Sequence, residues 1–163
     1  MALDRPSIAL TARRAASLAI AGSQARRATR FAAAMRERYH LPDDFELHIA
    51  SDIPEHIGLG SGTQLGIAVG VALARLYRRD TAVREIAAVA QRGQRSGIGA
   101  GAFEFGGFLV DGGKGVSDEP PPIIARIDFP EDWRIVLILE RASRGLHGEV
   151  ETAAFQSLPE FPE

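Results

Sequence analysis

A glycine-rich loop between two segments of different periodicity constrains the fold of this chain most strongly. The loop, residues 53–64, reads IPEHIGLGSGTQ and has glycines at positions 58, 60 and 62. Before it, Phe45, Leu47 and Ile49 alternate with other residues, which indicates a half-buried strand. After it, residues 63–77 carry apolar side chains at helical spacing, which predicts a core helix. We therefore expect a strand, a tight glycine loop and a buried helix in succession.

The same loop has the composition of an anion-binding site. Glycines permit positive backbone dihedrals and close approach, so successive N–H groups at the helix start can turn toward an anion. The helix dipole adds partial positive charge there, and the loop hydroxyls offer further donors or a helix cap. A glycine-rich turn that caps the helix without a ligand is the alternative interpretation. The predicted phosphate-binding residues are Gly58, Leu59, Gly60, Ser61, Gly62 and Thr63.

The remaining pattern predicts an α+β domain. The chain of 163 residues has the length of one domain, and 45% apolar with 25% charged residues is a globular composition. Asp80 and Thr81 are candidate N-caps of a helix from residue 83 to about 94. Another helix, residues 23–39, should bury Ala28, Phe31, Ala32 and Met35. Strands are expected at residues 7–12, 45–50, 105–111, 123–129 and 135–139.

Charge and composition exclude several classes of function. A formal net charge of -2 gives no bulk positive field, so we expect neither nucleic acid nor a membrane as a partner. The absence of cysteine excludes disulfides, thiolate zinc sites and a cysteine nucleophile. Residues 57–74 are uncharged but rich in glycine, which favours a loop entering a buried helix over a membrane span. We expect a cytoplasmic protein.

Four charged residues outside the loop are candidates for the chemistry. Arg92 and Arg95 stand where a helix meets the loop SGIG, and a guanidinium suits either a phosphate or a carboxylate. Solvated arginines at a helix end are the alternative. Glu104 lies in the apolar run AFEF, where a buried acid needs a partner or a raised pKa. Asp111 precedes two glycines at a strand end, which suits a turn or a ligand contact. Both acids are candidate catalytic residues.

Three separated motifs resemble one known family. The run from Pro54 to Gly62, P-x-x-x-G-L-G-S-G, resembles the phosphate-binding motif of the GHMP kinase superfamily. More narrowly, IPEHIGLGSGTQL, RGQRSGIGAGAFEFGGFLVDGG and PPPIIARIDFPEDWRIVLI resemble the beta-ribofuranosylaminobenzene 5'-phosphate synthases of methanopterin biosynthesis. Three motifs in one order are far more specific than the loop alone, and the resemblance runs from about residue 2 to residue 158.

The resemblance implies a fold, a reaction and partners. The fold is expected to be like ribosomal protein S5 domain 2. The reaction joins 4-aminobenzoate or 4-hydroxybenzoate to phosphoribosyl pyrophosphate, with loss of pyrophosphate and carbon dioxide and with Mg²⁺ as helper ion. Because the family is longer at both ends, residues 1–163 are expected to form one incomplete N-terminal domain without the C-terminal domain. An exposed apolar face should then favour self-association, and we expect a homodimer.

Two other functions compete with this interpretation. The first is an ATP-dependent small-molecule kinase, since the superfamily and the loop allow it. In mevalonate-type kinases the motif corresponding to Ser96-Gly97-Ile98-Gly99 resembles Ser-Gly-Ile-Asp, with the acid as base, so glycine here argues against a kinase. The second is a non-catalytic fragment that binds an anion. Anion binding without turnover would support this alternative.

Overall fold

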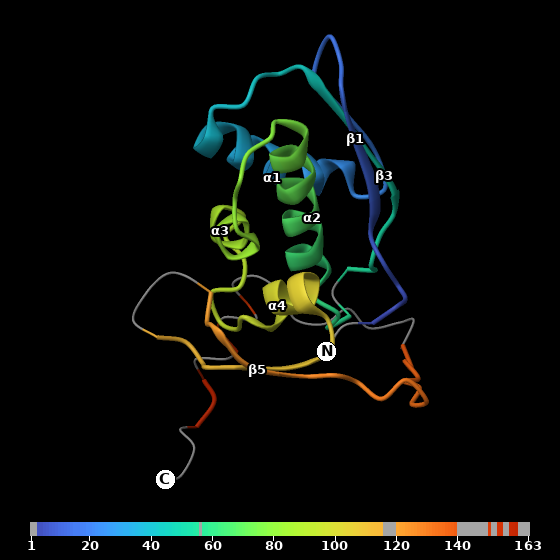
Figure 1. The fold of residues 1–163 in the computed structure, drawn as a ribbon, viewed down its shortest axis with the longest axis vertical. Coiled ribbons are helices and arrows are strands. Elements are labelled where there is room, and N and C mark those ends of the chain that lie inside the picture. The colour runs from blue at the N-terminus through green and yellow to red at the C-terminus, as the bar shows by residue number, and fades with distance from the viewer. Residues whose placement is uncertain are drawn as a thin grey trace.

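The computed structural model describes residues 3–55, 57–115 and 120–139, with residues 150, 153–154 and 157–159. It confirms an α+β architecture in which helices α1 and α2 pack on a sheet, α3 packs against α1 and α2, and α4 lies beside a second, smaller sheet (Figure 1). The described elements are β1 (Ala9–Arg14), β2 (Ala19–Gly22), α1 (Ala25–Tyr39), β3 (Phe45–Ser51), α2 (Ser61–Leu76), α3 (Val83–Val89), α4 (Ile98–Phe105), β4 (Phe108–Asp111) and β5 (Ile123–Ile127).

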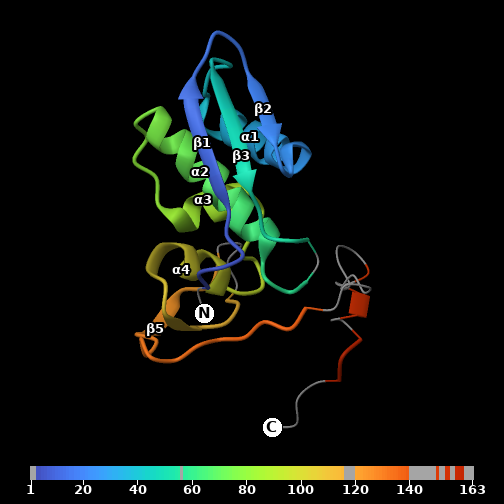
Figure 2. The ribbon, with the colours of Figure 1, turned by 90° about the vertical axis from the view of Figure 1, so that its right-hand side faces the viewer.

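Strand β3 is the centre of the three-stranded sheet, whose order is β1-β3-β2. It pairs antiparallel with β1 and parallel with β2, and Figure 2 shows the three strands side by side with α1 and α2 behind them. The alternation expected from the sequence is confirmed, because Phe45, Leu47 and Ile49 are at most 1% exposed. One face of β3 is therefore buried in the main core.

Helix α2 packs against β1, α1, α3 and α4 and is the most central element. Its glycines allow this approach: a Cβ atom at Gly70 would lie 2.2 Å from Ile86 of α3, and one at Gly66 would lie 3.2 Å from the Phe31 ring of α1. The prediction for α1 is also confirmed at the level of side chains. Its buried residues are Ala28, Phe31, Ala32 and Met35.

Two elements were not expected from the sequence. Strand β2 has only one partly buried side chain, that of Ile20, so it carries no alternating pattern. Helix α4 begins in the glycine-rich run after Gly97, and it takes up residue 105, so the strand expected at 105–111 starts only at Phe108. Because both elements are defined by contacts with distant segments, local periodicity does not reveal them.

Helix α3 is shorter than expected and is not capped as expected. It ends at Val89 rather than near residue 94, because the backbone reverses through Gln91 and Gly93, which both have positive φ. The N-cap residue is Ala82, with no side-chain cap hydrogen bond, so the assignment of Asp80 or Thr81 as cap was wrong.

The strand expected at residues 135–139 does not form. Strand β5 ends at Ile127, within the predicted range 123–129, and the described chain after it has no strand partner. Val136 is 81% exposed and Ile138 is 93% exposed, beside an exposed Trp133. β-propensity alone is insufficient without a neighbouring strand to satisfy the backbone and cover the side chains.

No helix in the described ranges is long and apolar enough to cross a membrane. The longest, α2, has 16 residues and belongs to the core of the domain.

Residues 133–139 generate a prediction about self-association. Replacing Val136 and Ile138 together by serine should reduce association and the binding of an apolar dye, because the two side chains are the most exposed in this apolar segment. Sedimentation velocity and dye fluorescence measure both effects. As a control, Val150→Ser removes an exposed apolar side chain outside the segment. A compact monomer without dye binding in the unaltered chain would contradict the prediction.

Candidate functional site

The glycine loop enters α2 through two residues with left-handed backbone conformation. Gly58 has φ 78° and Gly60, the N-cap of α2, has φ 69° and ψ 25°. A Cβ atom at either position would meet no other atom within 4 Å. The requirement for glycine here is therefore a positive φ, and the space beside the loop is open.

The first turn of α2 presents the backbone donors expected of an anion site. Gln64 N–H donates to Gly60 O at 3.1 Å, so the N–H groups that precede it belong to the set a helix leaves without an intrahelical acceptor. The N-cap is Gly60, which has no side chain, so neither Ser61 nor Thr63 occupies the cap position. Their hydroxyl groups remain candidate donors to a ligand.

Two guanidinium groups lie against Gly62 in this first turn. A Cβ atom at Gly62 would lie 2.6 Å from Arg27 Nη2 and 3.4 Å from the central guanidinium carbon of Arg92. Arg27 comes from α1, whereas Arg92 follows α3, where its backbone N–H donates to Ala87 O at 2.8 Å. The fold thus brings three separate segments together at the start of α2.

The two arginines have different surroundings. Arg27 Nη1 donates to Glu55 Oε1 at 2.8 Å and to Gln24 Oε1 at 3.1 Å. The Arg92 guanidinium lies 5.3 Å from the centre of the Phe31 ring, and its enclosed Nε has no acceptor. Burial, followed by the positive charges of Arg27 and Arg30, lowers the pKa of Arg92 below its usual value. The site is therefore electropositive.

Among the residues predicted from sequence, Arg92 is at the loop but Arg95 and Glu104 are in different surroundings. Arg95 is exposed in the turn that precedes α4. Glu104 is also exposed, so the expectation of a buried acid was wrong. The neighbouring Phe103 and Phe105 are 36% and 48% exposed, because α4 buries only Ala100 and Gly101. The catalytic role of Glu104 stays a prediction.

The Asp111 carboxylate, at the end of β4, forms hydrogen bonds to the residues at the start of α4. It accepts hydrogen bonds from Ser96 Oγ at 2.6 Å, from Gly97 N–H at 2.9 Å and from Gly113 N–H at 3.0 Å. The bond from Ser96 is the main cause of a lowered pKa of Asp111, and the backbone N–H groups lower it further. These bonds favour a positioning function for the carboxylate, while its predicted catalytic role is untested.

Gly99 is a packing residue at the contact between α4 and α2. A Cβ atom there would lie 2.8 Å from Thr63 Cγ2. Gln64 Nε2 donates to Gly99 O at 2.7 Å, which holds the two helix starts together. Any side chain at position 99 therefore has to displace Thr63 of the loop.

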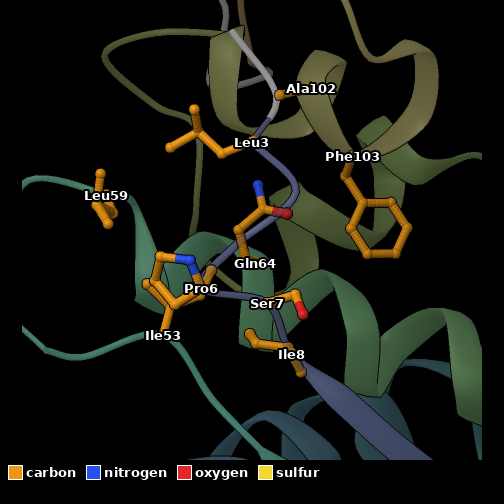
Figure 3. A pocket seen from close by; sticks show the side chains of 9 residues that line it. All are labelled: Leu3, Pro6, Ser7, Ile8, Ile53, Leu59, Gln64, Ala102 and Phe103. Carbon is orange, nitrogen blue, oxygen red and sulfur yellow. The ribbon is translucent and has the colours of Figure 1, made fainter. Parts of the chain in front are cut away.

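A pocket of about 310 Å³ borders the loop (Figure 3). Leu59 comes from the loop, Gln64 from the first turn of α2 and Phe103 from α4, so the same helix start borders both the pocket and the arginines. Apart from Ser7 and Gln64, the lining side chains are apolar, although about half of the exposed surface of the pocket is polar. The remaining lining residues are Leu3, Pro6, Ile8, Ile53 and Ala102.

The described residues form no cage of protein ligands for a magnesium ion. They include no group of three or more histidine, aspartate or glutamate side chains placed to hold a metal. Glu55, in the loop approach, is engaged with Arg27, and Asp52 accepts a hydrogen bond from Ser23. Magnesium stays a prediction from the resemblance, and no chemical step is derived through it.

Sequence reasoning missed Arg27 and the apolar pocket. Arg27 directly precedes the buried Ala28 and lies one helical turn before Phe31, which is the signal that places it beside the apolar stripe of α1. The pocket joins residues far apart in the chain, so no local pattern indicates it. His56, which lies in the loop approach, is outside the described residues.

Comparisons with known proteins place the loop within a known family. Residues 26–107, about half of the chain, match the family described as GHMP kinases N terminal domain. The chain is 36% identical to the beta-ribofuranosylphenol 5'-phosphate synthase of Archaeoglobus fulgidus over 168 residues, covering 96% of this chain and 53% of that protein. The synthase of the same name from Methanocaldococcus jannaschii is 41% identical over 133 residues, 72% of this chain and 40% of that protein. The chain thus spans about half the length of these relatives or less.

The contact at Gly99 predicts a compensating pair of substitutions. Gly99→Ala should destabilise the fold by about 1–2 kcal/mol, since overpacking costs more than the helix propensity that alanine adds. Thr63→Ser removes the Cγ2 methyl group and should restore most of that loss in the double variant. Denaturant unfolding of the four proteins of the cycle measures the coupling. Additive effects would show that the two residues do not touch.

The backbone of Gly60 predicts a loss of anion binding. Gly60→Val should abolish the binding of inorganic pyrophosphate, because a β-branched residue resists φ 69° and reshapes the loop. Gly60→Asn, which tolerates a left-handed conformation, should bind better than the valine variant. Gly113→Val is the control, since Gly113 also has a positive φ and open space. Undiminished binding by Gly60→Val in titration calorimetry would remove the loop from the site.

Proposed function

Since the chain belongs to the family of GHMP kinase N-terminal domains, we propose that its glycine loop binds a phosphorylated substrate for transfer of a phosphoribosyl group. The acceptor is an aromatic carboxylic acid, and phosphoribosyl pyrophosphate is the donor. This reaction belongs to tetrahydromethanopterin biosynthesis. The word phenol in the names of the relatives favours 4-hydroxybenzoate over 4-aminobenzoate as the acceptor.

One observation carries the proposal: the start of α2 borders both a cationic site and a pocket whose side chains are mostly apolar. Arg27 and Arg92 lie against Gly62, and the pocket begins at Leu59 and Gln64. A phosphoribosyl donor is highly anionic, whereas the acceptor has an apolar ring with one charged group. A volume of about 310 Å³ suits a ligand of one ring. The two surfaces match the two substrates in chemistry.

The chemistry asks the protein mainly to place charge and exclude water. A bond forms between ribose C1 and the ring carbon that carries the carboxylate, while the bond from C1 to pyrophosphate breaks and pyrophosphate leaves with the electron pair. The carboxylate then leaves as carbon dioxide, and its bonding electrons restore the aromatic ring. The loop N–H groups and the arginines stabilise phosphate charge, and the pocket orients the ring.

The contact at Gly99 disfavours the competing kinase. A kinase of this superfamily orients or deprotonates a hydroxyl group with a carboxylate near the loop. At position 99 an acid would have to displace Thr63, because a Cβ atom there would lie 2.8 Å from Thr63 Cγ2. The Asp111 carboxylate accepts three hydrogen bonds, and Glu104 is exposed. Decarboxylative attack by a ring needs no hydroxyl base, so a glycine is compatible with it.

A paired assay tests the proposal on the chain and on any longer product of its reading frame. We expect release of carbon dioxide and pyrophosphate from 4-hydroxybenzoate and phosphoribosyl pyrophosphate. The parallel assay follows ADP formation from ATP with mevalonate or homoserine. ADP formation without carbon dioxide release would overturn the proposal and favour the kinase. Binding of pyrophosphate without turnover in either protein would favour a non-catalytic anion-binding protein.

A further inference from the structure

Three arginines lie near the start of α2, and in the described part of the chain one carboxylate, that of Glu55, forms an ion pair with them. Arg27 and Arg92 lie on Gly62, and Arg30, one turn along α1 from Arg27, adds its charge to the field at Arg92. Of these, Arg27 is paired with Glu55. No carboxylate of the described chain pairs with Arg92, whose Nε is enclosed without an acceptor. Positive charge gathered without compensation is costly to the fold, so a ligand that neutralises it binds with a favourable free energy.

The position of the charges is as informative as their number. The Arg27 side chain is 17% exposed, and the Arg92 guanidinium lies 5.3 Å from the centre of the Phe31 ring. Packing therefore limits the freedom of both guanidinium groups, and little conformational entropy remains to be lost on binding. Gly62 leaves no Cβ atom between the guanidinium groups and the first backbone turn of α2.

We propose that Arg27, Arg92 and the first turn of α2 form a subsite for a pyrophosphate group, and that Glu55 occupies Arg27 when the subsite is empty. This inference rests on the proposed function, since it names the group that the same loop holds. The Glu55 carboxylate is an internal competitor that forms the contact an incoming anionic oxygen takes over. Removing its charge therefore strengthens ligand binding.

The charge balance favours pyrophosphate over a carboxylate as the occupant. Three guanidinium charges less the charge of Glu55 leave a surplus of about two, which a single carboxylate does not neutralise. Pyrophosphate has several anionic oxygens and can contact both guanidinium groups and the backbone donors together. The aromatic acid is better accommodated in the apolar pocket beside Leu59 and Phe103.

Titration calorimetry with inorganic pyrophosphate at low ionic strength tests the subsite in this chain. Arg27→Gln and Arg92→Gln should each weaken binding about tenfold or more, as expected for a charge-assisted hydrogen bond. Arg92→Lys, which keeps the charge but loses the planar fork, should fall between Arg92→Gln and the unaltered chain. Glu55→Gln should tighten binding several-fold. Circular dichroism and thermal unfolding of each variant confirm that it is folded.

Arg26→Gln is the matched control, because Arg26 is the exposed neighbour of Arg27 on α1 and its loss changes the net charge equally. It should alter the dissociation constant less than twofold. An equal effect of Arg26→Gln and Arg27→Gln would show that only general charge matters and would overturn the subsite. Absence of pyrophosphate binding by the unaltered chain would overturn it as well.

A second titration, with 4-hydroxybenzoate, tests whether the arginines bind the pyrophosphate group or the carboxylate of the aromatic acid. The arginine variants should bind this acid as the unaltered chain does, because the proposed ring site is the apolar pocket. If the arginine variants no longer bind 4-hydroxybenzoate but bind pyrophosphate as before, the proposal is overturned. The arginines would then be the residues that bind the carboxylate of the aromatic acid. If the arginine variants bind pyrophosphate normally while Gly60→Val does not, the subsite fails but the loop remains the anion site. Failure of the proposed function is a different result, namely ADP formation without carbon dioxide release.

Discussion

The close packing of α2 against its neighbours determines the rest of the structure. Gly70 lets Ile86 of α3 approach so closely that a Cβ atom would lie 2.2 Å from it, and Gly66 similarly admits Phe31 of α1. Such contacts tolerate no added methyl group without displacement of neighbouring side chains. They fix the helix within the core, and the direction in which its first turn points is fixed with it. The position of the glycine loop therefore depends on packing that occurs further along the same helix, at Gly66 and Gly70.

The same packing explains why charged residues from separate segments meet at one place. Phe31 is in the core and also lies beneath the Arg92 guanidinium, so a single ring links the helix contact to the electropositive site. Arg27 is one turn before Phe31 on α1 and faces Gly62. A cavity-forming change at Phe31 would therefore disturb stability and the site together. The site therefore lies at the edge of the core and shares Phe31 with it.

The elements that could be predicted from the sequence are those whose burial follows one local period. The buried stripe of α1 and the alternation of β3 are of this kind, because each element has one face in the main core. Helix α4 is different: its glycines at positions 99 and 101 argue against a helix locally, yet they allow contact with Thr63 and Ile123. Residues 135–139 have high β-propensity but no described strand beside them. The sequence indicated the glycine loop and Arg92 as candidate site residues. Arg27 could not be found in this way, because its position depends on which face of α1 packs against α2.

The glycines around the site serve two physical purposes, and the difference bears on function. Gly58 and Gly60 are required by positive φ and leave open space, which is the condition for a ligand to approach the backbone. Gly62 and Gly99 are required by close contact: Gly62 admits the guanidinium groups, and Gly99 admits Thr63. Gly99, which serves this second purpose, stands at the position where a kinase of this superfamily has its acid. With glycine at position 99 the chain has no acid there. Under the proposed function this suits a reaction in which the leaving group is an anion and no hydroxyl proton has to be removed.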